Sequence, residues 1–295
     1  MRTTTSVALT FLLTSACAGS GTTPRRPVGA DLEAYCAVAG QPGLDAWIGD
    51  VVTLCAPGED EHEASCRALR ARADGTLDPI AMPADAVPVR AMPAGAGVIA
   101  LLADGRLVRV ASSGLEELAA WASDPWIDEQ GARVVFVGLP DGIAEWELGA
   151  PTVIRALDLE SGVTTLLVDD AEASAPRTIP GSRDVLFTST ATGIASLWIA
   201  RDGGAAEALT NVGLVEMGPD AVPVPERDLA FVGTNLVYGV VLDDGTSRLW
   251  SLDLATGEAR ELGTGAWPRP HGGESVIALQ TTGDCAAVMP VGGAR

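Results

Sequence analysis

Residues 154–162 read IRALDLESG, an apolar strand pattern that runs into a tight turn. Residues 249–257, LWSLDLATG, repeat this pattern, and residues 197–204, LWIARDGG, give a third copy with a shorter turn. A chain that repeats one antiparallel unit every few tens of residues typically builds a ring or a stack of such units. The repeats therefore predict the architecture. They say much less about function, because one repeat architecture hosts many unrelated activities.

Apolar runs of strand character divide the chain into units of similar length. Their spacing is close to the roughly 40–50 residues of a propeller blade with four strands. Nearly continuous apolar runs are typical of strands that neighbouring blades cover on both faces. The runs begin at Val51, Val98, Val134, Val185, Leu229 and Val276. The sequence thus predicts an all-β fold, a β-propeller of about six four-stranded blades over residues 30–295.

Local signals support hairpins but leave two segments open. Asp-Gly pairs at 104–105 and 244–245 lie between apolar runs, and they favour tight hairpin turns because glycine tolerates positive φ. Residues 113–121, SGLEELAAW, fit either a short helix or an outer strand with its linker. Residues 25–49 could supply the strand that closes the last blade.

One stretch resembles a complete repeat of the TolB-type, WD-repeat-like β-propeller family. It comprises residues 184–193 (DVLFTSTATG), 196–204 (SLWIARDGG) and 207–211 (EALTN). These match the family's strand ending Phe-x-Ser, its Ile-Trp strand, its Asp-Gly-Gly turn and its closing Leu-Thr-Asn. Weaker copies cover most of residues 51–279. The family's Ser-Pro-Asp-Gly turn is replaced here by residues 179–184, IPGSRD, so the resemblance implies the strand scaffold without the partner contacts that those turns carry.

The N-terminus has the form of an export signal. Arg2 is followed by a short apolar core at residues 6–13 and by small residues that end at Cys17. This resembles the bacterial lipoprotein signal, whose cysteine is acylated. We therefore expect a signal peptide at residues 1–16, lipidation at Cys17 and a flexible tether at residues 17–29. Plain secretion is the alternative, because Thr14 stands where that motif prefers leucine.

The remaining cysteines predict disulfides, since an exported chain with an even number usually pairs them. Of the three possible pairings we favour Cys55–Cys66, which closes a local hairpin, together with Cys36–Cys285, which would join the two ends of the domain. Their spacing lacks paired Cys-x-x-Cys units, and paired units of this kind mark zinc sites. No metal is predicted.

Charge narrows the classes of partner. The formal net charge is −20, and acidic surfaces repel phosphate backbones, so no nucleic acid is expected. An anionic membrane surface is disfavoured for the same reason. Membrane contact is expected only through the lipid at Cys17. The absence of an acidic residue just after this cysteine favours the outer membrane, with the protein facing the periplasm or the surface.

No catalytic constellation stands out, and no cofactor is predicted. A serine hydrolase would need His62 or His271 as its base. His62 lies in a charged loop, whereas His271 lies in a turn rich in proline and glycine that could face the central channel. Acidic clusters at 59–61, 169–170 and 243–244 could offer oxygen ligands to calcium, although each is more simply a solvated turn.

The tryptophans separate into two groups. Trp198 and Trp250 occupy matching repeat positions, which predicts that they anchor the core between blades. Residues 141–149, DGIAEWELG, form an inserted loop that carries Trp146. The candidate partner contacts are Trp146, Trp267 and His271. An exposed aromatic side chain of this kind often dominates a binding interface.

The sequence favours a non-catalytic, lipid-anchored binding scaffold in the bacterial cell envelope, with a protein or peptide as partner. The main alternative is a calcium-dependent propeller enzyme of lactonase or lyase type, with carboxylates in the central funnel. The sequence is also compatible with an architectural spacer and with a sugar-binding protein that uses Trp146 or Trp267.

Overall fold

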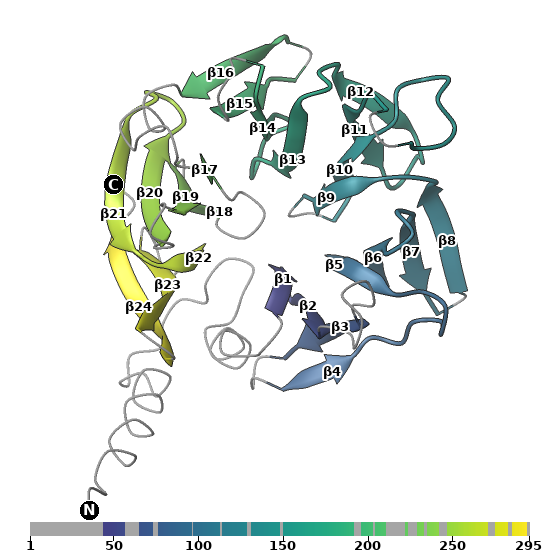
Figure 1. Ribbon diagram of the computed structural model, residues 1–295, viewed down its shortest axis with the longest axis horizontal. Helices are drawn as coiled ribbons and strands as arrows, with labels where there is room; N and C mark the ends of the chain where they lie inside the picture. Colours follow the sequence, from purple (N-terminus) through teal and green to yellow (C-terminus); the bar gives the residue numbers. More distant parts are fainter. Residues whose placement is uncertain are drawn as a thin grey trace, which may run out of the picture.

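The computed structural model describes the chain from residue 44 to residue 293, with gaps. The described ranges are 44–56, 65–72, 76–95, 97–112, 114–128, 131–147, 150–191, 196–202, 204–210, 222–223, 229–232, 235–241, 247–270, 275–282 and 285–293. Every regular element within them is a β-strand. The strands form six antiparallel sheets around a ring (Figure 1).

The first three sheets have four strands each. Sheet 1 contains β1 (Leu44–Ile48), β2 (Val51–Ala56), β3 (Ser65–Ala71) and β4 (Leu77–Pro79). Sheet 2 contains β5 (Pro88–Ala94), β6 (Gly97–Leu102), β7 (Leu107–Ala111) and β8 (Gly114–Ala119). Sheet 3 contains β9 (Ser123–Ile127), β10 (Arg133–Gly138), β11 (Val153–Asp158) and β12 (Thr164–Val168).

The last three sheets differ in strand number. Sheet 4 contains β13 (Ala173–Thr178), β14 (Val185–Ser189), β15 (Ser196–Ala200) and β16 (Ala206–Thr210). Sheet 5 contains β17 (Val222–Pro223), β18 (Leu229–Val232), β19 (Asn235–Val241), β20 (Ser247–Asp253) and β21 (Ala259–Thr264). Sheet 6 contains β22 (Ala266–Pro270), β23 (Ser275–Thr282) and β24 (Cys285–Gly293).

The predicted all-β propeller of four-stranded blades is confirmed, with a smaller number of complete blades. Five sheets have four strands or more within the described ranges, and sheet 6 has three. The estimate of about six four-stranded blades therefore exceeds the number of full blades by one. Strand β8 settles the open choice for residues 113–121 in favour of an outer strand. Strand β1 pairs with β2 in the first sheet, not in the last.

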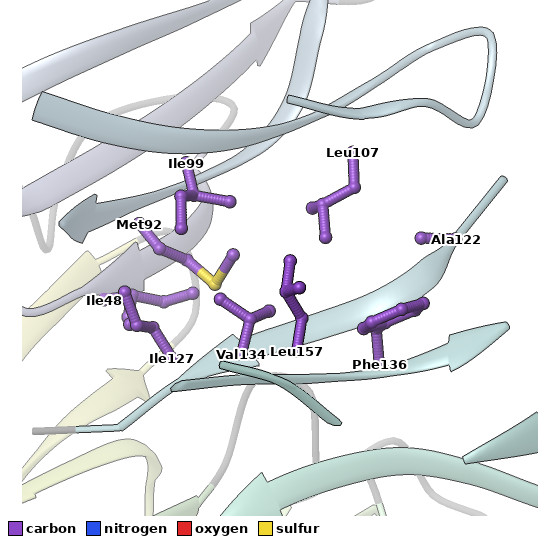
Figure 2. Packing of buried hydrophobic residues seen from close by; sticks show 9 residues of the cluster. All are labelled: Ile48, Met92, Ile99, Leu107, Ala122, Ile127, Val134, Phe136 and Leu157. Carbon is purple, nitrogen blue, oxygen red and sulfur yellow. The ribbon is translucent and has the colours of Figure 1, made fainter. Parts of the chain in front are cut away.

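The core lies between neighbouring sheets. Figure 2 shows one such layer, in which Met92 and Ile99 of sheet 2 face Val134 and Leu157 of sheet 3. Similar clusters join sheets 1 and 2, 3 and 4, 4 and 5, and 5 and 6. Each fully buried large side chain stabilises the fold by about 1.5–3 kcal/mol. The apolar runs in the sequence are thus the strands that these layers bury on both faces.

The two most similar repeats close in the same turn. The N–H of Gly162 donates to the Asp158 carbonyl at 2.9 Å, and the N–H of Gly257 donates to the Asp253 carbonyl at 2.8 Å. Both glycines have positive φ, 70° and 75°, which glycine adopts without steric cost. Hydrogen bonds from the backbone and side chain of Ser161 lower the pKa of Asp158. The Asp-x-x-x-Gly repeat therefore encodes the turn that joins the third and fourth strands.

The local disulfide is confirmed. Cys55 on β2 is the register partner of Cys66 on β3, and the two side chains form a disulfide. The backbone of Cys285 belongs to β24, whereas Cys36 lies outside the described residues. The Cys36–Cys285 pairing stays a prediction.

Candidate functional site

The antiparallel order of sheet 3 brings three chain segments to one edge. Ser123, at the start of β9, pairs with Val137 near the end of β10. Gly138 pairs with Val153, so the long β10–β11 loop leaves from the same edge. We call this side of the sheet, where the ends of β9, β10 and β11 meet, the loop-bearing edge of sheet 3; it is distinct from the outermost strand β12. It joins the inner strand, which faces the centre of the ring (Figure 1), to the inserted loop that the sequence indicated.

Arg155 on β11 fixes the inserted loop to the sheet. Its Nε donates to the Leu139 carbonyl at 2.7 Å, and its Nη2 donates to Asp141 Oδ1 at 2.6 Å. Beyond this anchor, residues 141–147 are all exposed. The loop therefore begins in a defined place and presents its side chains to solvent.

Trp146 stands on this loop and stacks on Trp121. The two ring centroids are 5.6 Å apart and the ring planes differ by 2°. Trp121 also packs against the β6–β7 turn, where a Cβ added to Gly105 would lie 2.9 Å from Trp121 Cδ1. Trp146 nevertheless keeps 44% of its surface exposed. The stack thus holds an exposed indole in one orientation, with its support provided by the neighbouring sheet.

Charged residues join the inner strands of adjacent sheets near this edge. Arg90 on β5 lies 3.6 Å from Asp124 on β9, with side chains that are 11% and 21% exposed. Ser123 donates a hydrogen bond from Oγ to Asp124 Oδ2 at 3.2 Å. Such a partly buried ion pair fixes the relative position of two strands more than it adds net stability.

A second cationic side chain lies between sheets 3 and 4. The Arg177 guanidinium on β13 lies 4.2 Å from the ring centroid of Trp126 on β9. Its Nη1 donates to the Pro176 carbonyl at 2.8 Å, and the whole residue is buried. A desolvated cation–π contact of this kind contributes about 2 kcal/mol. Arg177 therefore helps to hold the inner strands of sheets 3 and 4 together.

Three of the inner strands share a proline-containing irregularity that sequence reasoning missed. The register shifts at Pro125 in β9, at Pro176 in β13 and at Pro268 in β22. Asp124 and Ala175, which precede two of these prolines, have φ of 48° and 49°. Proline lacks the N–H of the sheet ladder, so it fits an edge strand at a bulge. The recurring proline was the available signal for these inner strands, and hence for Asp124, Trp126 and Arg177.

The predicted site residues do not gather in one place. Trp146 is exposed on sheet 3, whereas Trp267 belongs to β22 in sheet 6. His271 and Cys17 lie outside the described residues. Trp198 and Trp250 pack partly buried against inter-sheet clusters, as predicted for core anchors.

Neither a metal site nor a membrane-spanning helix is found in the described part of the chain. No group of three or more His, Cys, Asp or Glu side chains in the described ranges could hold a metal ion. No helix in those ranges is long and apolar enough to cross a membrane.

The sequence matches no protein-family model and no curated protein. Its structure is similar to a putative TolB from Agrobacterium tumefaciens, with a TM-score of 0.52 and 16% identity over 77% of this chain and 80% of that one. The fold is that of a TolB-like β-propeller. The resemblance that the sequence suggested is thus confirmed at the level of the fold.

The fold is also similar to that of enzymes. A puromycin hydrolase gives a TM-score of 0.59 at 19% identity over 91% of this chain, which spans only 48% of that one. An oligogalacturonate lyase in complex with manganese gives a TM-score of 0.54 at 11% identity over 88% and 72% of the two chains. These likenesses establish the fold and leave the activity to be argued from this chain's own residues.

Proposed function

We propose that this TolB-like propeller is a non-catalytic binding protein of the bacterial cell envelope, anchored by a lipid on Cys17. Its partner is a protein or peptide that docks at the loop-bearing edge of sheet 3. The observation that carries the proposal is the exposed, stacked indole of Trp146 on the anchored loop.

The physics of binding favours this position. Tryptophan is enriched among the few residues that dominate interface energies. A side chain already held in one orientation loses little conformational entropy when a partner docks. Ile143 on the same loop is 36% exposed, so the loop offers a second apolar contact. Glu145 and Glu147, both exposed, favour a partner whose rim is positively charged.

The similar structures support a binding role without deciding it. They include the Agrobacterium TolB and a chain of a nidogen–laminin complex, which has a TM-score of 0.51 and 11% identity over 81% of this chain and 92% of that one. They also include the hydrolase and the lyase. A calcium-dependent enzyme therefore stays the alternative that an experiment must address.

The test begins with a partner captured from an envelope extract of the source bacterium and then purified. We expect Trp146→Ala to weaken its affinity about 30-fold, because truncation of a central tryptophan costs about 2 kcal/mol or more. Trp146→Phe keeps an aromatic ring stacked on Trp121, so its affinity for the partner should fall much less. The measurement is isothermal titration calorimetry. Equal affinities for the wild type and Trp146→Ala would rule out this docking site.

The same calorimeter addresses the enzyme alternative. Calcium added to the wild type should release no binding heat and should not shift the thermal midpoint. A calcium site together with metal-dependent turnover of a lactone or an oligosaccharide would contradict the non-catalytic role. Quenching of tryptophan fluorescence by glycans would instead support sugar recognition.

The lipid anchor has its own test. We expect the wild-type chain to incorporate labelled fatty acid and to sediment with membranes, whereas Cys17→Ser should do neither, because the lipid is attached through the cysteine sulfur that serine lacks. Labelling that persists in Cys17→Ser would place the anchor elsewhere.

A further inference from the structure

Among the residues whose side-chain burial the structure describes, the exposed large hydrophobic ones all belong to sheet 3 and its loops. Two of them, Ile143 and Trp146, lie on the inserted loop. The other two are Val163, 55% exposed, and Leu166, 49% exposed. Val163 directly precedes β12 and Leu166 lies in its middle, and β12 is the outermost strand of the sheet (Figure 1). The two pairs lie apart, because the β10–β11 loop and the β11–β12 turn leave from opposite ends of β11. An exposed apolar pair on an outermost strand is a candidate interaction site.

Strand β12 also lacks the charged residues that the other outermost strands carry, although its register with β11 shifts between Leu166 and Val168. In the other sheets with a fourth strand, that strand holds at least one charged residue: Asp78 in β4, Glu116 and Glu117 in β8, Glu207 in β16, and Arg260 and Glu261 in β21. Strand β12 reads TTLLV, without charge, proline or glycine. An edge strand without charged residues exposes unpaired backbone groups that pair readily with another strand.

The hydrogen bonds around the β11–β12 turn define which backbone groups of β12 point outward. The N–H of Asp158 donates to the Val163 carbonyl at 3.0 Å, whereas the N–H of Leu159 donates to Ala132 on the other side. Because the bonding direction alternates along an antiparallel strand, Thr165 bonds inward to β11. The backbone N–H and C=O groups of Thr164 and Leu166 therefore face the perimeter.

We propose that β12 is an attachment site at which an extended segment of another protein adds as a further strand of sheet 3. The segment takes up the outward groups of Thr164 and Leu166 and places its alternate apolar side chains on the face of the sheet that carries Leu166. This is β-strand addition, in which main-chain bonds supply affinity and alternate side chains supply specificity. The proposal goes beyond docking at Trp146, because β12 lies on the perimeter of the ring.

Charge selects the occupant. Strand β12 is preceded by Glu160 and followed by Asp169, and both are exposed. A second copy paired antiparallel about Thr165 would bring Glu160 opposite Asp170, and like charges facing each other across a strand pair are destabilising. A neutral, β-branched segment flanked by arginine or lysine meets opposite charge at both ends. The occupant is therefore a different chain with basic flanks, not a second copy.

The test uses the full chain and a synthetic peptide, Arg-Arg-Thr-Val-Thr-Val-Thr-Arg-Arg, labelled with a fluorophore. We expect the peptide to slow amide hydrogen exchange in the segment around residues 163–168. We also expect a peptide with glutamate in place of the four arginines to bind about tenfold more weakly or worse. Exchange slowed elsewhere but not at this segment would overturn the proposal.

Matched variants isolate the backbone contact. Thr164→Pro removes an outward N–H that the β11–β12 ladder does not use, so the fold should persist while peptide affinity falls about tenfold or more. Thr164→Val keeps that N–H and should bind like the wild type. Leu166→Lys introduces a charged side chain of the kind that usually protects an edge strand, so it should also abolish peptide binding. This variant replaces Thr164→Pro if the proline variant fails to fold. Retained binding in both Thr164→Pro and Leu166→Lys would overturn the proposal.

Two further measurements separate the outcomes. Trp146→Ala should leave the peptide's protection of β12 unchanged, so failure of the Trp146 site and failure of the β12 site are distinguishable. Light scattering should give the mass of a single chain over the concentrations used. A doubled mass with β12 protected in the absence of peptide would show a second copy on the edge and would overturn the choice of occupant.

Discussion

Phe187→Ala should lower the free energy of unfolding by about 3–5 kcal/mol, the usual cost of removing a buried phenylalanine. Phe187 on β14 is 1% exposed and packs in the layer between sheets 3 and 4 with Ile154 and Val168. Its ring also lies against Trp198, with centroids 6.3 Å apart. The loss should be large because the cavity would open between two sheets whose inner strands are tied together by Arg177 and Trp126.

Urea denaturation followed by circular dichroism measures this loss. The matched control is Leu166→Ala on the exposed edge of sheet 3, for which we expect a change within about 0.5 kcal/mol. A loss below about 1 kcal/mol for Phe187→Ala would mean that the layer between sheets 3 and 4 is not a close-packed core.

Removal of the Cys55–Cys66 disulfide is expected to have the second largest effect on stability. The two cysteines are 11 residues apart, and the chain-entropy model gives about 3 kcal/mol for closing a loop of that size in the unfolded state. The double variant Cys55→Ala/Cys66→Ala should therefore unfold at a lower urea concentration than the oxidised wild type. The double variant should lose stability but keep its fold, because the disulfide joins the neighbouring strands β2 and β3 of one sheet and does not link two sheets.

Reduction provides the control for this variant. A reducing agent should destabilise the wild type by a similar amount and should leave the double variant unchanged. If the double variant were as stable as the oxidised protein, the bond would contribute nothing beyond the β2–β3 pairing.

The fold was predictable because its signals are local and repeated. The aspartates at 158 and 253 recur with a glycine four residues later, and both copies form the same turn. The apolar runs that begin near Val98, Val134 and Val185 became second strands buried between sheets. The number of complete blades was overestimated because an apolar run signals one strand of a sheet and says nothing of how many strands join it.

The candidate site was predictable only in part. The inserted loop and its tryptophan were visible because residues 141–149 interrupt the strand pattern. The stack on Trp121 was not, since it joins that loop to the linker between β8 and β9. The Arg90–Asp124 and Arg177–Trp126 contacts cross between sheets. Contacts of this kind depend on how blades sit around the ring, which strand periodicity does not encode.

The uncharged outermost strand β12 could not be recognised from the sequence for a different reason. Its residues read as an ordinary strand, TTLLV, and nothing in that pattern distinguishes an outermost strand from an inner one. The absence of charged residues is notable only because β12 lies at the perimeter, since a buried strand needs no charged residues. Comparison with the charged outermost strands of the other sheets then becomes possible.

The central claim is that a protein partner docks at the loop-bearing edge of sheet 3. Its most direct test is a photo-crosslinking amino acid placed at Ile143 in the full chain, expressed in its own bacterium, with the same group at Glu116 on β8 as control. We expect one discrete protein adduct from position 143, lost when Trp146→Ala is added, and no such adduct from position 116. Identical adducts from both positions, or an adduct from position 143 that survives Trp146→Ala, would contradict it.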